Sequence, residues 1–246
     1  MKRLIPVLLL DRNWRLVKTV GFGARTYIGD PFNVIRLFNE CEVDEICVLD
    51  IDAERYGLEP QFDKLKQLAS ECFMPLSYGG GLRSVESVEQ LNRWGIEKFV
   101  LRSYAHDKML VNKLVQQFGS QALLACLNYR GCGDTAVSDD GKNVVQKATQ
   151  LEAMGFGEVI LQSIDRDGTR EGYDLDMINR VASKLSIPLI ALGGAGIYSH
   201  LSEALQAGAQ AAASGSAFCF VGRQRAVLVN YPSPQEAEVL VTRGVA

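Results

Sequence analysis

The sequence predicts an α/β protein, a (β/α)8 barrel built from two half-barrel repeats. Three observations predict this fold: a length of 246 residues, an internal repeat in which Glu45 matches Glu158, and short apolar segments that alternate with amphipathic ones. A barrel of this kind usually needs about 250 residues, and with 47% hydrophobic residues the chain can fill one large core. We expect one domain over residues 1–246, with half-barrels over roughly 1–119 and 120–246.

The repeat matches residues 45–103 with residues 158–216 without a gap. Both copies share an Ile-Asp pair, a proline that precedes a strand, two adjacent glycines and a closing serine. Within each copy, strand patterns alternate with helix patterns, which implies right-handed βαβ units and a parallel sheet. An open, doubly wound sheet is the alternative, but it does not explain two equivalent halves.

The individual elements follow from apolar periodicity. The first unit is the strand IPVLLL with a helix that starts at Pro31 and is capped by Asp30. The first copy of the repeat then supplies EICVLDID, FDKLKQLASEC, PLSYGGG, SVESVEQLNRWG and KFVLRS, and the second copy supplies their equivalents. The strand ALLACLN and a helix around 143–154 connect the copies. Eight strand–helix units result, the number that closes a barrel.

Composition excludes several classes of function. A net charge of −3 and a pI near 5.5 provide no basic field for nucleic acid or an anionic membrane. The first apolar run is interrupted by Pro6, so we expect a strand there rather than a signal peptide, and a cytoplasmic protein without membrane spans. Six cysteines form no C-x-x-C pair and only His106 and His200 are histidines, so we expect reduced thiols, no metal site and no cofactor.

Glycines at the ends of strands predict phosphate binding. Ligands of such barrels bind where strands end, and glycine there lets backbone N–H groups approach a phosphate. The candidate ligands are Gly80, Gly81, Arg102 and Ser103 in one half, and Gly168, Thr169, Gly193, Gly194, Gly215 and Ser216 in the other. The alternative is that these glycines only allow tight turns. Because the repeat doubles the pattern, we predict two phosphate cradles for a phosphorylated small molecule.

Several segments resemble a known family. SIDRDGTREGYD, IALGGAG, FGSQA and LIPVLLL…LVKT are similar to HisF, the cyclase subunit of imidazole glycerol phosphate synthase, over nearly the whole chain. YIGDPFNVIRLFNECEVDE, ASECFMPLSYGGG and RAVLVNYPS are more similar to the paralogues called glycosyl amidation-associated protein, WbuZ. The resemblance implies a barrel that receives ammonia from a HisH-like glutaminase at its N-terminal face. In the paralogues, it implies conversion of an acetamido group of a surface sugar into an acetamidino group.

The catalytic end departs from the family. Leu9 and Asn128 occupy the positions of its two essential aspartates, and neither side chain titrates near pH 7, as general acid–base catalysis requires. The catalytic candidates are Asn128 itself, Asp11, two positions after Leu9, Asp50, which matches a rim acid, and Lys18, which matches a loop lysine that contacts substrate. Arg102 replaces an asparagine, and the loop after Asn128 is shorter than in the family. Each of the three charges is alternatively an ordinary solvated side chain.

The opposite end keeps four charged residues. Arg3, Glu45, Lys98 and Glu158 match the family's ammonia gate, and alternation along a strand allows all four to point into the barrel. A single charge at the start of a strand is usually a surface ion pair, whereas four with inward parity suggest a ring. We therefore expect an ammonia-channelling subunit of a sugar-amidating system. The alternatives are a working imidazole glycerol phosphate cyclase and a non-catalytic barrel that binds a phosphorylated ligand.

Overall fold

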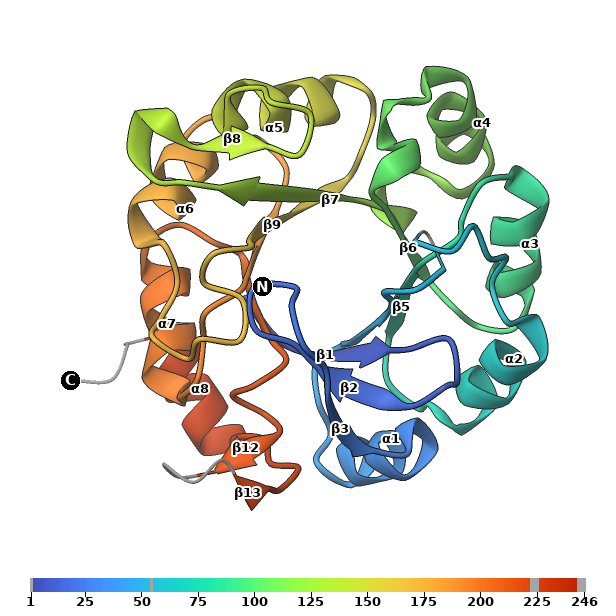
Figure 1. Cartoon of the computed structure of the whole chain (residues 1–246), viewed down its shortest axis with the longest axis vertical. Helices are drawn as coiled ribbons and strands as arrows, with labels where there is room; N and C mark the ends of the chain where they lie inside the picture. Colours follow the sequence, from blue (N-terminus) through green and yellow to red (C-terminus); the bar gives the residue numbers. More distant parts are fainter. Residues whose placement is uncertain (1, 54, 222–225, 243–246) are drawn as a thin grey trace.

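The computed structural model describes residues 2–53, 55–221 and 226–242 (Figure 1). Eight parallel strands form the barrel: β1(Arg3–Leu10), β4(Ile46–Asp50), β5(Leu76–Gly79), β6(Lys98–Leu101), β7(Leu123–Arg130), β9(Glu158–Ser163), β10(Leu189–Leu192) and β11(Ala211–Ser214). The last strand pairs with the first in the register Arg3 to Ala211, which closes the sheet. The predicted (β/α)8 barrel is confirmed.

Helices surround the barrel between successive strands, as Figure 1 shows. They are α1(Pro31–Glu40), α2(Phe62–Glu71), α3(Val85–Arg93), α4(Lys108–Phe118), α5(Val144–Ala153), α6(Leu175–Ala182), α7(Tyr198–Gln206) and α8(Pro234–Thr242). The Asp30 side chain accepts a hydrogen bond from the backbone N–H of Asn33 at the start of α1, as expected of an N-cap. The helix expected around 143–154 is α5, capped by Asn143.

Several short elements that the sequence patterns did not predict connect or extend the barrel strands. Strands β2(Leu16–Lys18) and β3(Thr26–Gly29) extend β1 as an antiparallel hairpin, and β8(Val137–Ser138) folds back on β7. The 3-10 helices are η1(Ser103–His106), η2(Ser120–Ala122) and η3(Gly133–Thr135), and β12(Phe220–Val221) pairs with β13(Ala226–Val227). The β2–β3 connection, η1 and β8 form part of the walls around the ligand-binding end.

Two separate apolar layers stabilise the barrel. The larger lies between the strands and the helices, and includes Leu4, Leu8 and Phe38. The smaller fills the inside of the barrel and includes Val7, Val100 and Ile160. This division follows from the alternation of side chains along each strand. Within the described part of the chain, no helix combines the length and apolar character of a membrane span, and no cluster of metal-ligating side chains is found.

Candidate functional site

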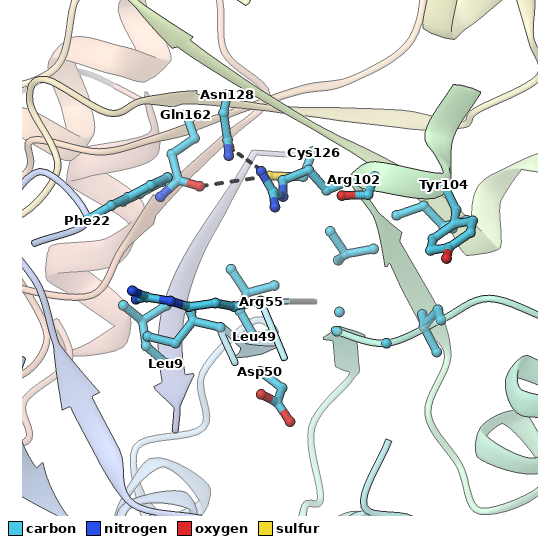
Figure 2. A pocket seen from close by; sticks show the side chains of 18 of the residues that line it. Leu9, Phe22, Leu49, Asp50, Arg55, Arg102, Tyr104, Cys126, Asn128 and Gln162 are labelled. Atoms are coloured by element: carbon cyan, nitrogen blue, oxygen red, sulfur yellow. Dashed lines mark hydrogen bonds between the residues drawn. The ribbon is translucent and has the colours of Figure 1, made fainter. Parts of the chain in front are cut away.

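A cavity of about 350 Å³ opens at the C-terminal ends of the strands. Its floor is apolar where Leu9, Leu49 and Val100 line it. Figure 2 shows Leu9 and Asn128 on opposite sides of this cavity, with Gln162 and Phe22 beside Asn128. The walls also carry four arginines, namely Arg25, Arg55, Arg83 and Arg102. An apolar floor under positively charged walls favours an anionic ligand.

The first predicted cradle lies in this cavity, because Gly80, Gly81, Arg102 and Ser103 all line it. Gly80 has a φ of 135°, and a Cβ atom there would lie 2.7 Å from the Cβ of Asp50. Close packing alone therefore explains this glycine, as the alternative interpretation held. The same bare backbone still leaves room for a phosphate beside the start of η1, so the cradle stays a prediction.

The second predicted cradle surrounds a separate small cavity of about 20 Å³. Its lining includes five of the predicted ligands, namely Gly168, Gly193, Gly194, Gly215 and Ser216. Thr169 is not among the lining residues, because its hydroxyl donates to the carbonyl oxygen of Arg166 within its own turn at 2.9 Å. The structure thus brings together every predicted ligand of this half except Thr169.

Lys18 also lines the small cavity. Its Nζ donates to the carbonyl oxygen of Val7 at 2.7 Å, and a Cβ atom on Gly215 would approach that Nζ to 2.5 Å. Burial lowers the pKa of Lys18, although the charges of Cys219 and Asp167 oppose the shift. Among the described residues, no carboxylate lies within ion-pair distance of this ammonium group, so a bound phosphate would supply a missing counter-charge.

The catalytic candidates fall into different places. Asn128 and Asp50 line the central cavity, and Asp50 is the one carboxylate among its described lining residues. Burial raises the pKa of Asp50, and the nearby charges of Asp52 and Asp11 add to this, although backbone N–H groups of Ala53 and Asp52 donate to its carboxylate. Asp50 is therefore a buried acid in the cavity whose pKa lies above the usual carboxyl value.

Asp11 lies elsewhere, and the expectation that it shares the orientation of Leu9 is wrong. Strand β1 ends at Leu10, and the chain then turns into β2. The Asp11 carboxylate accepts hydrogen bonds from the backbone N–H groups of Asn13 and Arg15 and from the Arg15 side chain. It closes the turn and is absent from the lining of the central cavity, so it does not replace the acid missing at Leu9.

At the N-terminal end of the barrel, the four predicted gate residues form a closed ring of ion pairs. Arg3 donates to Glu45 and to Glu158, each at 2.6 Å. Lys98 donates to the same two carboxylates at 2.8 and 2.9 Å. Burial lowers the pKa of Arg3, but the hydrogen bonds and charges of Glu158 and Glu45 produce a net increase. Opposite charges therefore alternate around the constriction, as a ring requires.

The ring is asymmetric at the level of atoms. Glu158 uses one oxygen for each cation, whereas Glu45 uses only Oε2 for both. Glu45 Oε1 is buried and has no hydrogen-bond partner within the described part of the chain. A buried carboxylate oxygen without a donor is costly, so this atom is suited to accept an N–H or O–H from a small guest.

Between the ring and the cavity, the inside of the barrel is apolar. Ile5, Val7, Cys47 and Leu124 belong to this layer. Burial raises the pKa of the Cys47 thiol to about 12, so this sulfur stays uncharged at neutral pH. An apolar interior favours neutral molecules over ions.

Sequence reasoning missed part of the site. Gln162 has the same inward parity as Glu158, a signal that could have identified it. Phe22 and Arg25 lie on the connection between β2 and β3, where no periodic pattern exists. Their position depends on the hairpin, which sequence reasoning did not predict.

Comparison with known proteins identifies the family. The model of the family described as histidine biosynthesis protein matches residues 3–223. The chain is 34% identical, over all of its length and 98% of the relative, to imidazole glycerol phosphate synthase subunit HisF of Exiguobacterium sibiricum. It is 41% identical, over 97% of its length and 98% of the relative, to a Pseudomonas aeruginosa protein with the provisional name imidazole glycerol phosphate synthase subunit hisF2. A Leptospira borgpetersenii protein, provisionally named as subunit HisF, is 38% identical over 97% of the chain and 98% of the relative. The chain therefore belongs to the histidine biosynthesis protein family and, within it, to the HisF proteins and their paralogues.

Proposed function

We propose that this chain is the ammonia-channelling subunit of a glutamine-dependent amidotransferase system that amidates a surface-polysaccharide sugar, from acetamido to acetamidino. One observation carries the proposal. The ion-pair ring of Arg3, Glu45, Lys98 and Glu158 is complete, whereas the opposite end has Leu9 and Asn128 in place of the family's aspartates. A barrel that keeps the ammonia gate but lacks the family's two catalytic aspartates is expected to deliver ammonia to a reaction other than cyclisation. The resemblance to the WbuZ paralogues also supports amidation of a sugar as the final reaction.

In this proposal, a HisH-like glutaminase docks on the N-terminal face and releases ammonia beneath the ring. The ring pairs two cations with two carboxylates and carries no net charge, and the apolar interior above it disfavours any ion. Neutral ammonia is small and can donate an N–H to Glu45 Oε1 as it passes. The free cysteines, none of them in a disulfide, are in keeping with the cytoplasmic location that we propose.

At the far end, the two cradles hold the phosphate groups of a small ligand. Lys18 supplies positive charge to one cradle and Arg102 to the other. Asp50 exchanges protons with whatever group receives ammonia, because its carboxylate is buried and its pKa is raised. We therefore propose a lyase-like, ammonia-using subunit that needs no cofactor.

The cyclase of histidine biosynthesis is the second candidate, favoured by the 34% identity to a named HisF subunit over the full chain. It requires Asp11 or another group to replace the aspartates that are absent at Leu9 and Asn128. A binding barrel without catalytic activity is the third candidate, and it requires neither an open conduit nor a glutaminase.

The decisive experiment measures amidated sugar formed per glutamine hydrolysed, with the purified glutaminase partner present. Replacement of Lys98 by Ala should lower this ratio, because the ring loses the cation between Glu45 and Glu158. Lys113→Ala is the matched control, since Lys113 is an exposed residue of α4. Glutaminase activity should also rise when the barrel is added and rise further with a rim ligand. An unchanged ratio, or no complex with any glutaminase encoded nearby, would favour the binding barrel.

A further inference from the structure

A third cavity lies beside the central one. It measures about 250 Å³, and its walls come from η1, from the residues around the β7–β8 hairpin and from α5. We call it the side compartment. Four residues line both it and the central cavity: Arg102, Ser103, Cys126 and Asn128. The two spaces are therefore adjacent and share one wall.

The shared wall is held by an ion pair at the rim. Arg102 Nη1 lies 3.0 Å from Asp139 Oδ2, and the two side chains are 42% and 45% exposed. Exposed pairs of this kind contribute little to stability, because water screens them. Figure 2 shows Arg102 close to Cys126 and Asn128, at the edge of the central cavity. Arg102 therefore lies between the two spaces and pairs with Asp139 at the rim.

The side compartment offers hydrogen-bond donors and acceptors together. Lys147 is a donor, His106 can donate or accept, and the carboxylates of Asp139 and Asp140 accept. Burial raises the pKa of Asp140, but hydrogen bonds from Lys147 and Ser138 and the nearby lysine charges produce a large net decrease, so it is ionised at neutral pH. A small apolar surface remains between these groups, where Ala105, Leu127 and Leu151 line the compartment.

This lining selects one chemical class. A hydroxyl both donates and accepts, so a ring with several hydroxyls can pair with lysine, histidine and carboxylates at once. Lys147 pairs with Asp140 at 2.8 Å and Arg102 pairs with Asp139 at 3.0 Å, so a hydroxyl can add to these pairs as a donor or an acceptor, whereas a phosphate would face the two carboxylates. The volume is also far larger than the ~10–15 Å³ that a single water needs. A polyhydroxylated ring fits all three conditions.

We propose that the side compartment binds the sugar ring of a ligand whose phosphate lies in the first cradle, beside Gly80 and Gly81. Ser103 connects the two parts, because it belongs both to that cradle and to the shared wall. The ligand class is therefore a sugar phosphate rather than a phosphate ester of an apolar alcohol. The proposal rests on the phosphate-binding part of the proposed function, and it does not depend on the glutaminase.

The test is calorimetric titration of the full chain with inorganic phosphate and with N-acetylglucosamine 1-phosphate. We expect the sugar phosphate to bind at least about tenfold more tightly, the gain of one or two well-placed hydrogen bonds. His106→Trp fills the side compartment from its exposed edge and should reduce the sugar phosphate to the affinity of inorganic phosphate. Met109→Trp is the matched control, because Met109 is 72% exposed, three residues further on, and lines neither cavity.

Lys147→Met gives a second measurement that does not depend on the conformation that the tryptophan side chain adopts in His106→Trp. It removes one donor, keeps the length of the side chain and should also weaken only the sugar phosphate. Equal affinities of wild type for the two ligands would overturn the sugar site while leaving the cradle intact. If neither inorganic phosphate nor the sugar phosphate binds to the wild-type protein, both the cradle and the sugar site are overturned. A tenfold preference that survives in both variants would also overturn the assignment of the ring to this compartment.

Discussion

Replacement of Lys98 by Met removes one cation from the ion-pair ring and keeps most of the side-chain volume. Lys98 Nζ bridges Glu45 and Glu158 at 2.8 and 2.9 Å, and its side chain is 17% exposed. Without it, Arg3 alone neutralises two carboxylates. The excess negative charge lies in a constriction where Glu45 is only 2% exposed.

The expected loss of unfolding free energy in Lys98→Met lies between the values for a buried ion pair and for an exposed one. Loss of one partner from a buried pair costs about 3–5 kcal/mol, whereas an exposed pair contributes about 0–1 kcal/mol. Because Glu45 is buried and Lys98 retains some contact with water, we expect Lys98→Met to lower the free energy of unfolding by about 2–3 kcal/mol. Lys113→Met, on the exposed side of α4, should change it by less than about 0.5 kcal/mol.

A double-mutant cycle separates charge from packing. Glu158→Gln alone removes an acid and leaves Arg3 and Lys98 with one carboxylate, so it should also destabilise the barrel. In the double variant with Lys98→Met, one cation and one acid remain, and the ring is neutral again. We expect the double variant to be more stable than the sum of the single effects predicts, by about 1–3 kcal/mol.

Urea unfolding of the barrel alone, followed by circular dichroism, measures all four proteins at low and high salt. The coupling should decrease as salt is added, because screening weakens the repulsion between the remaining acids. Strict additivity of the two substitutions would refute the neutral ring and leave only lost packing as the cause. A Lys98→Met protein as stable as wild type would refute the importance of this cation.

Three further outcomes are expected. The protein should not rescue a histidine auxotroph that lacks the cyclase, since Leu9 and Asn128 cannot transfer protons; growth of the complemented strain would promote the cyclase hypothesis. Sulfate or phosphate should bind at Gly80 and at Gly193, and a titration to millimolar concentration without binding at either would disprove the cradles. Asp11→Asn should lower the free energy of unfolding at neutral pH by about 1–2 kcal/mol. Burial alone would raise the pKa of Asp11, but the hydrogen bonds to its carboxylate outweigh burial, so its pKa in the folded protein lies below the ordinary value. The difference in stability between wild type and Asp11→Asn should therefore be complete above the ordinary carboxyl pKa and should disappear as the pH falls through the lowered pKa of the folded protein.

The sequence predicted those parts of the structure that repeat. The eight barrel strands follow from apolar runs at a regular spacing, and the internal repeat indicated two equivalent halves. The ring residues were matched through the resemblance to the family's ammonia gate, and the period of two along a strand predicted that all four side chains could point into the barrel. Arg3, Lys98 and Glu158 are the first residues of their strands, and Glu45 immediately precedes its strand.

The incorrect expectation concerns a residue just beyond the end of a strand, where the alternation of side chains between the two faces of the sheet stops. The orientation of Asp11 was inferred as if β1 continued, but the chain reverses direction directly after Leu10. Asp followed two residues later by Asn is a turn signal, and here the Asp11 carboxylate does accept the Asn13 N–H. The Thr169 hydroxyl likewise donates within its own turn, to the carbonyl oxygen of Arg166, and its role as a phosphate ligand stays a prediction. Side chains that close turns are easily mistaken for ligands when only sequence is used.

The side compartment had no signal in the sequence, because it depends on how the β7–β8 hairpin lies against η1. Neither segment is periodic, and the residues that meet there are far apart in the chain. Only the shortened loop after Asn128 and the unusual Arg102 indicated that this wall differs from the family.

The chemistry of the ring gives a reason, beyond stability, for its presence. Apolar residues of similar volume could replace a buried ion-pair cluster at little or no cost in stability, so such a cluster is weak evidence of a stabilising role. Within the described residues, Glu45 Oε1 is also buried without a protein donor, although buried carboxylate oxygens are usually hydrogen-bonded. A group that accepts one small donor, under an apolar interior that admits only neutral molecules, matches the needs of ammonia transfer. The unpaired oxygen therefore supports a conduit more than a structural ion-pair cluster.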